Sequence, residues 1–220
     1  MKQNRIILTL LFTLIVGLSM PAKAESLDKL VPQAADIFGR FKREDILNMD
    51  LVKEAKGIVI MNVKGFSIGI GGSGGDGILM ARTDKGWSGP VGISTQGGTL
   101  GIDVGGVNRD VVLLLMNNGI VTKWANGESF GQSSATVAAG PSGASALDST
   151  MKNKDCYIYS TTSGAKIGVN FGGLDVDINN EGNANYYDKP LVSAKDILNN
   201  NVEVPASKKD ALARLYDLLK

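Results

Sequence analysis

The side chains that could do chemistry in this chain are carboxylates, amines and guanidinium groups, because none of its 220 residues is histidine. The lack of imidazole removes the commonest general base and the commonest metal ligand. It also excludes Ser-His-Asp and Cys-His catalysis and zinc sites built on histidine. No pair of carboxylates is singled out by spacing or by an apolar setting. We therefore expect no catalytic residues, no metal site and no cofactor, and a protein that is not an enzyme.

A glycine-rich stretch, residues 69–77 (GIGGSGGDG), contains the spacing G-x-G-x-x-G twice. A dinucleotide site needs a helix directly after such a loop, because the helix N-terminus binds the phosphates. Residues 78–83 (ILMART) follow instead and favour a strand. We therefore expect no nucleotide at this loop.

Asp175, Asp177 and Asn179 alternate as residues do at the start of a calcium-binding loop. Such a loop has glycine at its sixth position and glutamate at its twelfth. Asn180 and Tyr186 stand there in this chain. An ordinary strand with one side facing solvent therefore explains the alternation better than a calcium site does.

Three cations, Arg40, Lys42 and Arg43, form the candidate binding cluster, at the end of a predicted helix. Apolar residues recur at helical spacing over residues 27–41, and Ser26 is a candidate N-cap. Pro32 fits poorly inside this helix, so a helix that starts at Pro32 is the alternative.

Two interpretations of this helix remain open. Cations near a helix C-terminus are favoured by the helix dipole, in which case the apolar face simply packs on a core. Alternatively, the helix lies on an anionic membrane, with its aromatic side chains in the lipid and its cations at the head groups. On this second interpretation the lipid-binding residues are Phe38, Arg40, Phe41, Lys42 and Arg43.

The first 24 residues resemble a secretory signal peptide. Lys2 and Arg5 form a basic start, residues 6–18 are an apolar run, and residues 22–24 (AKA) supply a small-x-small cleavage site. The apolar run is too short to span a membrane comfortably. We expect an exported protein of the periplasm or cell envelope, with residues 1–24 removed before Glu25 and residues 25–220 forming one domain.

The remaining chain would carry 20 basic and 22 acidic side chains, a net charge of −2, so nucleic acid is not an expected partner. Cys156 is the only cysteine, which excludes an internal disulfide. Its place beside an apolar strand predicts a buried packing residue.

One glycine-laced pattern occurs twice, as residues 100–106 (LGIDVGG) and 167–173 (IGVNFGG). In a strand, its apolar residues would share one face, and the glycines Gly101 and Gly168 would lie on the other. Because the glycine face of the strand carries almost no side chains, it suits either strong curvature and close packing or a ligand groove.

The other patterns predict strands in the middle of the chain and helices at both ends. Residues 78–94 and 111–124 each read as a hairpin around a turn, and the unbroken run 111–116 (VVLLLM) predicts a central strand covered on both sides. A short helix is expected over residues 44–55, and Ser193 and Ser207 are candidate caps near the C-terminus. The predicted fold class is α+β: one domain with a strongly curved, antiparallel, glycine-rich and partly barrel-like sheet, flanked by N- and C-terminal helices.

Taken in order, several segments resemble the SYLF domain family, which is known for a yeast actin-binding member. The glycine-rich segment and strand lead into Trp87-Ser88-Gly89-Pro90, similar to the family's W-S-x-P element, and residues 55–63 (AKGIVIMNV) are similar to its opening strand. Residues 137–143 (VAAGPSG) are similar to its A-G-P-x-G turn. Residues 183–188 (NANYYD) are similar to its segment N-x-x-Y-Y-G, with Asp188 where the family usually has glycine.

This resemblance implies binding of phosphoinositides and other acidic lipids, partly through an N-terminal amphipathic segment, and actin contact in fungal members. For a small exported protein of bacterial type, we expect a non-enzymatic module that contacts anionic phospholipid or a membrane surface in the cell envelope, and we expect no contact with actin. The alternative is a structural or protein-interaction domain of the periplasm, with an envelope protein as partner and no lipid ligand.

We predict that export removes residues 1–24, because the AKA site directly follows the apolar run and its proline. The intact mass of protein from the envelope fraction should then correspond to a chain that begins at Glu25. A mass that includes residues 1–24 would contradict the prediction.

Overall fold

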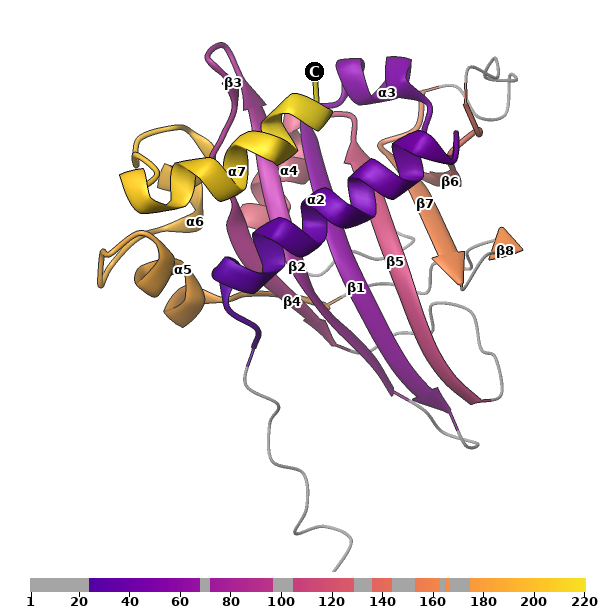
Figure 1. Ribbon diagram of the computed structural model, residues 1–220, viewed down its shortest axis with the longest axis horizontal. Coiled ribbons are helices and arrows are strands. Elements are labelled where there is room, and N and C mark those ends of the chain that lie inside the picture. Colours follow the sequence, from indigo (N-terminus) through magenta and orange to yellow (C-terminus); the bar gives the residue numbers. More distant parts are fainter. Residues whose placement is uncertain are drawn as a thin grey trace, which may run out of the picture.

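The computed structural model describes residues 24–67, 72–96, 105–128, 136–143, 153–162, 165–166 and 175–220. Figure 1 shows a sheet of long strands with helices packed on it. In chain order the elements are α2 (Leu27–Arg43), α3 (Met49–Glu54), β1 (Gly57–Ser67), β2 (Gly72–Thr83), β3 (Gly86–Trp87), β4 (Val91–Gln96), β5 (Gly105–Leu115), α4 (Asn118–Ala125), β6 (Val137–Ala139), β7 (Cys156–Thr162), β8 (Ala165–Lys166), β9 (Asp175–Ile178), α5 (Asn180–Tyr186), α6 (Ala194–Leu198) and α7 (Ala206–Leu218).

The strands lie in the order β6-β7-β5-β1-β2-β4-β9, with β3 paired to β2 and β8 paired to β7. The predicted α+β class with helices at both ends is confirmed. Two details differ from the expectation. The sheet is mixed, because β6 pairs with β7 in parallel, and it is open, because β6 and β9 lie at opposite ends of the strand order.

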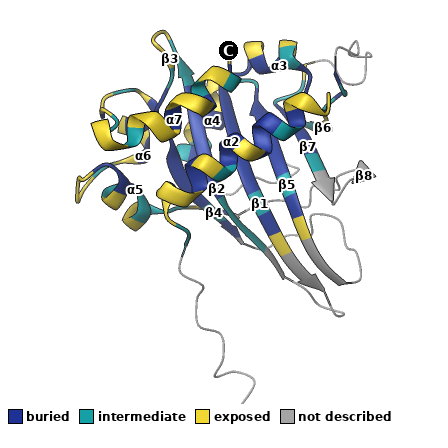
Figure 2. Ribbon diagram, in the orientation of Figure 1, coloured by how far each residue is buried: buried dark blue, intermediate teal, exposed yellow. Residues whose placement is uncertain are grey.

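The two faces of the sheet are covered by different helices. Figure 1 shows α2 and α7 in front of the strands and α4 behind them. Ile60 of β1 lies in register with Ile78 of β2 and Val112 of β5, so these side chains share one face. The predicted central strand is confirmed, since residues 111–115 of β5 are all buried between β1 and β7 (Figure 2).

Helices α2 and α7 run side by side in the same direction. Asp28, near the start of α2, pairs with Lys208 at 2.6 Å, and Asp36 pairs with Arg214 at 2.6 Å. Helix α2 begins at Leu27, so the alternative start at Pro32 is wrong, and the proline ring lies on the exposed side of the helix. Within the ranges that the structure describes, no helix has the length and apolar character needed to cross a bilayer.

The predicted hairpin over residues 111–124 is wrong, because its second half is helix α4. The Asn117 side chain accepts a hydrogen bond from the Ile120 N–H at 3.0 Å and so caps the helix. Ile120, Val121 and Trp124 then recur at helical spacing and are buried. A local Asn-Asn-Gly sequence suits a turn, but here Asn117 makes an N-cap.

Helix α3 and the start of α7 also differ from the sequence-based expectation, whereas the cap of α6 agrees with it. Helix α3 is shorter than predicted, since it begins after its cap Asn48 and ends at Glu54. Ser193 caps α6 through the Asp196 N–H at 3.0 Å, as predicted. The other candidate cap is wrong, because α7 begins at Ala206 and its N-cap is Pro205, which places Ser207 inside the helix.

Some predictions concern residues outside the described ranges. The two glycine-laced repeats lie outside these ranges, apart from the backbone of residues 105–106. Gly101, Gly168 and residues 1–23 are therefore outside the described part of the chain.

We predict that Asn117→Ala lowers the free energy of unfolding by about 1–2 kcal/mol, the effect of removing an N-cap. The variant also loses the hydrogen bond from Asn117 Nδ2 to Asp155 Oδ1, which is 2.7 Å long. Urea denaturation measures the change. Asn118→Ala is the matched control, because the Asn118 side chain is exposed at the next position, and its effect should stay within about 0.5 kcal/mol. Equal effects of the two substitutions would contradict the capping role.

Candidate functional site

Hydrogen bonds to three other parts of the chain hold the Trp-Ser-Gly-Pro segment in place. Ser88 is fully buried, and its Oγ accepts the Ala81 N–H at 2.9 Å. The Tyr187 hydroxyl donates to the Pro90 carbonyl at 2.9 Å, and the Tyr216 hydroxyl donates to the Ser88 carbonyl at 3.1 Å. This segment therefore joins β2, α5 and α7, and its polar atoms serve the fold.

Asn183 fastens the start of β4 in the same way. Its Oδ1 accepts the Gly92 N–H at 2.7 Å, and its Nδ2 lies 3.5 Å from the Gly92 carbonyl oxygen. A Cβ atom on Gly92 would lie 2.5 Å from Leu27 Cδ1, so a side chain at this position would force the Leu27 side chain to move. Asp188, where the family usually has glycine, has φ of 52°, a conformation that glycine adopts most readily and aspartate tolerates.

Trp87 is half-buried and stacks on Arg82, whose guanidinium carbon lies 4.2 Å from the ring centroid. The guanidinium group also donates to the carbonyl groups of Ala55 and Val52, at 2.9 Å each, at the end of α3. The Arg82–Trp87 pair therefore anchors α3 to the hairpin of β2 and β3.

A row of polar side chains crosses the sheet on the face that carries α2. Asp76 of β2 lies in register with Ser94 of β4 and with Asn62 of β1, and Asn62 lies in register with Asp110 of β5. We call Ser94, Asp76, Asn62 and Asp110 the polar row. It directly follows the buried row of Ile78, Ile60 and Val112, and the Asn62 amide donates to Asp110 Oδ1 at 2.8 Å.

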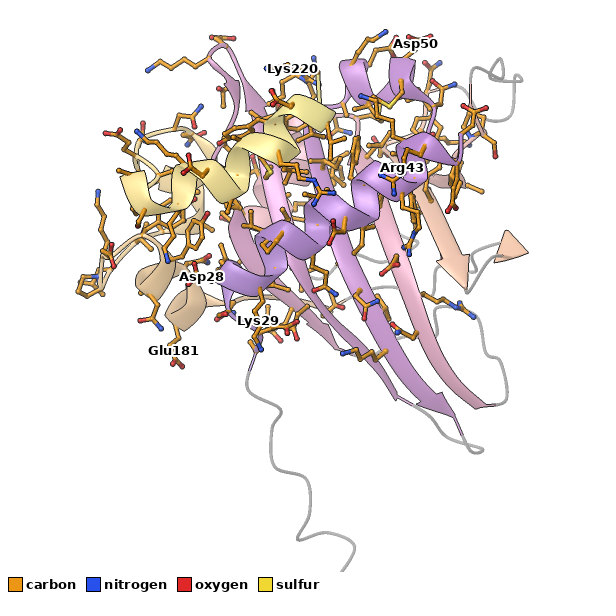
Figure 3. All side chains as sticks on the ribbon, viewed as in Figure 1. Asp28, Lys29, Arg43, Asp50, Glu181 and Lys220 are labelled. Carbon is orange, nitrogen blue, oxygen red and sulfur yellow. The ribbon has the colours of Figure 1, made fainter. Side chains whose placement is uncertain are left out.

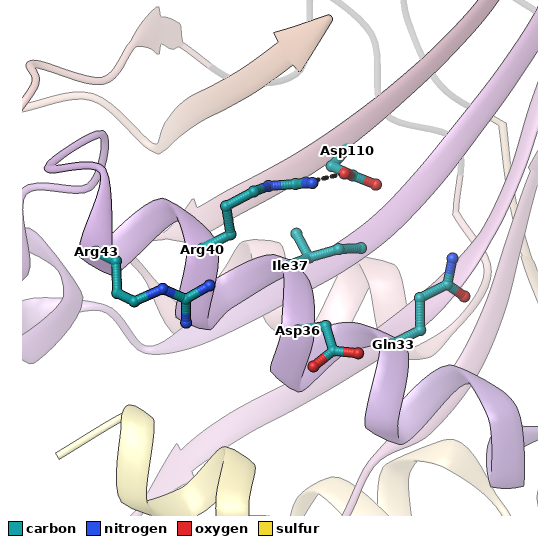
Figure 4. A pocket seen from close by; sticks show the side chains of 6 residues that line it. All are labelled: Gln33, Asp36, Ile37, Arg40, Arg43 and Asp110. Atoms are coloured by element: carbon teal, nitrogen blue, oxygen red, sulfur yellow. Dashed lines mark hydrogen bonds and ion pairs between the residues drawn. The ribbon is translucent and has the colours of Figure 1, made fainter. Parts of the chain in front are cut away.

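Arg40 of α2 forms an ion pair with Asp110 at one end of the polar row. Beside this pair lies a pocket of about 360 Å³ between α2 and β5 (Figure 4). Its lining consists of Gln33, Asp36, Ile37, Arg40, Arg43 and Asp110. Both carboxylates already have cationic partners, since Asp36 pairs with Arg214 of α7.

A second pocket, of about 570 Å³, lies beside α7. The loop before α7 lines it together with Gly89 of the Trp-Ser-Gly-Pro segment and with Leu212, Ala213 and Tyr216. In the part of the chain that the structure describes, no three Cys, Asp or Glu side chains lie close enough to hold a metal ion.

The predicted lipid-binding residues separate into two groups. Phe38 and Phe41 are fully buried and pack in the core, so neither ring is available to a membrane in this structure. Arg40 is half-exposed, whereas Lys42 and Arg43 are exposed (Figure 3 labels Arg43). The apolar face of α2 therefore matches the core-packing interpretation.

The three cations do different things. The Lys42 ammonium group donates to the Leu218 carbonyl at 2.9 Å, at the C-terminal end of α7, where the helix dipole favours a cation. Arg40 is held by Asp110. Among the described residues, Arg43 has no acidic partner, and its guanidinium group lies beside the pocket in Figure 4.

Sequence reasoning missed Asn62, Asp110 and Gln33, which adjoin Arg40 or its pocket. A visible signal existed for two of them, because Asn62 and Asp110 are polar residues beside the apolar runs of β1 and β5. Bringing them together requires the register of the two strands, which alternation alone does not specify.

Comparison with known proteins places this fold in a family. The family model described as "Ysc84: Las17-binding protein actin regulator" matches residues 96–220, more than half of the chain. The chain therefore belongs to the SYLF (Ysc84) family.

Several curated relatives match over most of the chain. Protein YSC84 of Saccharomyces cerevisiae is 30% identical over 186 residues, covering 80% of this chain and 39% of the relative. SH3 domain-containing YSC84-like protein 1 of Rattus norvegicus is 27% identical and covers 91% of this chain and 59% of the relative. An SH3 domain-containing protein of Schizosaccharomyces pombe is 27% identical, with 90% and 47% covered. The chain thus spans about half the length of these relatives.

The family description names a binding protein and a regulator. Residues of two motifs that carry the family resemblance, Ser88, Pro90, Asn183 and Tyr187, all make hydrogen bonds inside the domain. These family motifs therefore account for the fold, and a binding surface has to be sought elsewhere, on α2 and the polar row.

We predict that Asn183→Ala destabilises the domain by about 1–3 kcal/mol, because the buried Gly92 N–H loses its acceptor. Thermal or urea unfolding followed by circular dichroism measures the change. The control is Asn180→Ala, at an exposed position of the same helix, which should be nearly neutral. If Asn183→Ala unfolds like the wild type, the fastening of β4 by Asn183 is not an important source of stability.

Proposed function

We propose that this chain is a non-enzymatic binding module of the cell envelope, exported by its first 24 residues, that contacts the phosphate groups of anionic phospholipids through the pocket between α2 and β5. The observation that carries the proposal is that two arginines, Arg40 and Arg43, line one pocket of about 360 Å³.

Guanidinium groups bind phosphate with two parallel hydrogen bonds, which makes arginine the preferred residue at such sites. Arg43 is exposed, so it can turn to a ligand without breaking an ion pair within the described residues. Arg40, Arg43 and Arg214 against Asp36 and Asp110 leave a formal charge of +1 around the pocket. This excess favours an anion.

The contact is expected to be electrostatic and weak. Phe38 and Phe41 are buried, so they cannot add apolar insertion while α2 stays on the sheet. A basic group near an anionic surface contributes about 1 kcal/mol. The net charge of −2 expected after cleavage gives no long-range attraction, so binding depends on local contact.

A protein partner is the second candidate. The family description names a Las17-binding protein and actin regulator, and a relative from Saccharomyces cerevisiae carries the name YSC84. A chain with this fold could therefore bind a protein of the envelope, or an actin filament if it meets one. Actin filaments belong in the same sedimentation assay as the vesicles.

We predict that Arg43→Gln weakens binding of the chain from Glu25 to vesicles of phosphatidylglycerol and phosphatidylcholine about fivefold, which corresponds to about 1 kcal/mol. Binding of the wild type should fall as salt rises, because ions screen exposed charges. Co-sedimentation at low and at physiological salt measures both effects.

The matched control is Lys29→Gln, which removes an exposed cation near the other end of α2 and should leave binding unchanged. Equal losses for the two variants would indicate a general charge effect and contradict the pocket. If the wild type ignores anionic vesicles at low salt, the lipid proposal fails, and sedimentation with actin filaments would favour the protein-binding candidate.

A further inference from the structure

One large apolar side chain lies fully exposed on the surface. Within the part of the chain that the structure describes, Leu191 is the only large hydrophobic residue in the exposed class, and its exposed fraction is 99%. It lies between α5 and α6, in a segment at the left margin of the molecule in Figure 1 that is mostly exposed in Figure 2. A single exposed leucine needs no explanation by itself. It becomes informative where the same molecule offers a matching cavity.

The segment that carries this leucine, residues 188–192, is held at both ends. We call it the Leu191 loop. At its start, the Lys189 N–H donates to the Ala184 carbonyl of α5 at 3.0 Å. Just after its end, the Ser193 hydroxyl caps α6. Pro190 has a fixed φ angle. The loop therefore presents Leu191 in one arrangement, and a contact made there loses little conformational freedom.

The pocket of about 570 Å³ beside α7 is the matching cavity, and we call it the α7 pocket. Its volume lies in the range of pockets that take small organic molecules, so it has room for a leucine side chain. Apolar side chains make up half of its lining: Val202, Val204, Leu212, Ala213 and Tyr216.

The walls of the α7 pocket are already in place without a ligand. The Asn200 side-chain amide donates to Thr83 Oγ1 at 2.7 Å, and the Asn201 N–H donates to the Asp196 carbonyl at 2.9 Å. On the other side, the Tyr216 hydroxyl is held by the Ser88 carbonyl. An apolar side chain can therefore enter a preformed site.

The charges around the loop and the pocket are complementary. Glu203 and Lys209 line the pocket and form an exposed ion pair of 2.8 Å. Asp188 and Lys189 precede Leu191 and are exposed. A second copy can therefore bring its Lys189 to Glu203. It can also bring its Asp188 to Lys209. Charged groups around an apolar centre are the usual arrangement of a protein interface, and they fix orientation more than they add affinity.

The Leu191 loop and the α7 pocket are neighbours on the surface. Helix α6 (Ala194–Leu198) alone separates the loop from residues 200–204 of the pocket lining. A helix of five residues is only about 7–8 Å long. A two-fold axis that passes between the loop and the pocket can therefore bring each loop to the pocket of the other copy, and the same contact is then made twice.

We propose that two copies of this domain associate about a two-fold axis, with Leu191 of each copy in the α7 pocket of the other. Each copy then buries a side chain that is fully exposed in the monomer, and removal of this apolar surface from water drives the association. The inference goes beyond the proposed function, since it uses neither the pocket between α2 and β5 nor a lipid.

The experiment is sedimentation velocity on the protein as it is recovered from cells that express the full chain. The contact is small, so we expect a dissociation constant between about 1 µM and 1 mM and a mass that rises with concentration from one chain to two. A mass of one chain throughout this range would overturn the inference. A mass that keeps growing beyond two chains would overturn the two-fold arrangement.

Two variants test the two halves of the contact. Leu191→Ser should weaken association about 100-fold, because an apolar side chain is lost from each copy. Its fold should be unaffected, since Leu191 is exposed in the monomer. Ala213→Glu should weaken association at least about tenfold, because it places a carboxylate in the apolar lining. Association of Leu191→Ser equal to that of the wild type would overturn the inference.

The matched control for the pocket is Ala211→Glu, which adds the same charge at another exposed position of α7 and should change association by no more than about twofold. Equal losses for Ala211→Glu and Ala213→Glu would indicate a general charge effect and overturn the assignment of the pocket. Circular dichroism of each variant checks its fold. Should Ala213→Glu fail to fold, Leu191→Ser decides by itself.

The outcomes are separable from those of the proposed function. Vesicle binding is tested with Arg43→Gln, whereas self-association is tested with Leu191→Ser, which should leave vesicle binding unchanged. Loss of vesicle binding in Leu191→Ser, together with a wild type that stays a single chain, would overturn self-association and make Leu191 a membrane contact.

Discussion

The arrangement of the helical layer depends on the hydrogen bonds that the Asn183 side chain makes with the backbone N–H and carbonyl groups of Gly92. They tie the start of β4 to α5 at a place where a side chain on residue 92 would collide with Leu27 of α2. Tyr187 and Tyr216 hold the preceding carbonyl groups of Pro90 and Ser88. The sheet and three helices, α2, α5 and α7, therefore meet at one short segment, and a buried N–H without its partner there would be costly.

The surface polar groups follow from the position in which α2 is held. The helix covers the row of Ile60, Ile78 and Val112, while β1 and β5 continue past it, as Figure 2 shows. The next row on the same face consists of polar residues, because water reaches it at the margin of the helix. The pair of Arg40 and Asp110 lies at this margin and links the helix to the polar row. The candidate anion pocket also lies along this boundary.

The features that were predicted correctly are those that short-range sequence patterns determine. The run of apolar residues in β5, the cap at Ser193 and the burial of Cys156 each depend on a few neighbouring residues, and each is confirmed. Helix α4 was missed because Asn117 and its neighbours satisfy the rules for a turn as well as those for an N-cap. The aromatic residues of α2 posed a similar ambiguity, because an amphipathic helix has the same periodicity on a core as on a membrane. The polar row could not be assembled at all without strand register.

The buried Cys156 can report on the pairing of the strands near one edge of the sheet. Its sulfur lies on β7, between β5 and β6, and burial raises the pKa of the thiol, so the reactive thiolate is suppressed while these strands stay paired. A thiol reagent can reach the sulfur only when the pairing opens, and the chain has no second cysteine to confuse the signal. The rate of alkylation therefore measures how often these strands open, and the measurement needs no added label. The same seclusion keeps folded molecules from joining through mixed disulfides, a linkage that only unfolded chains could form.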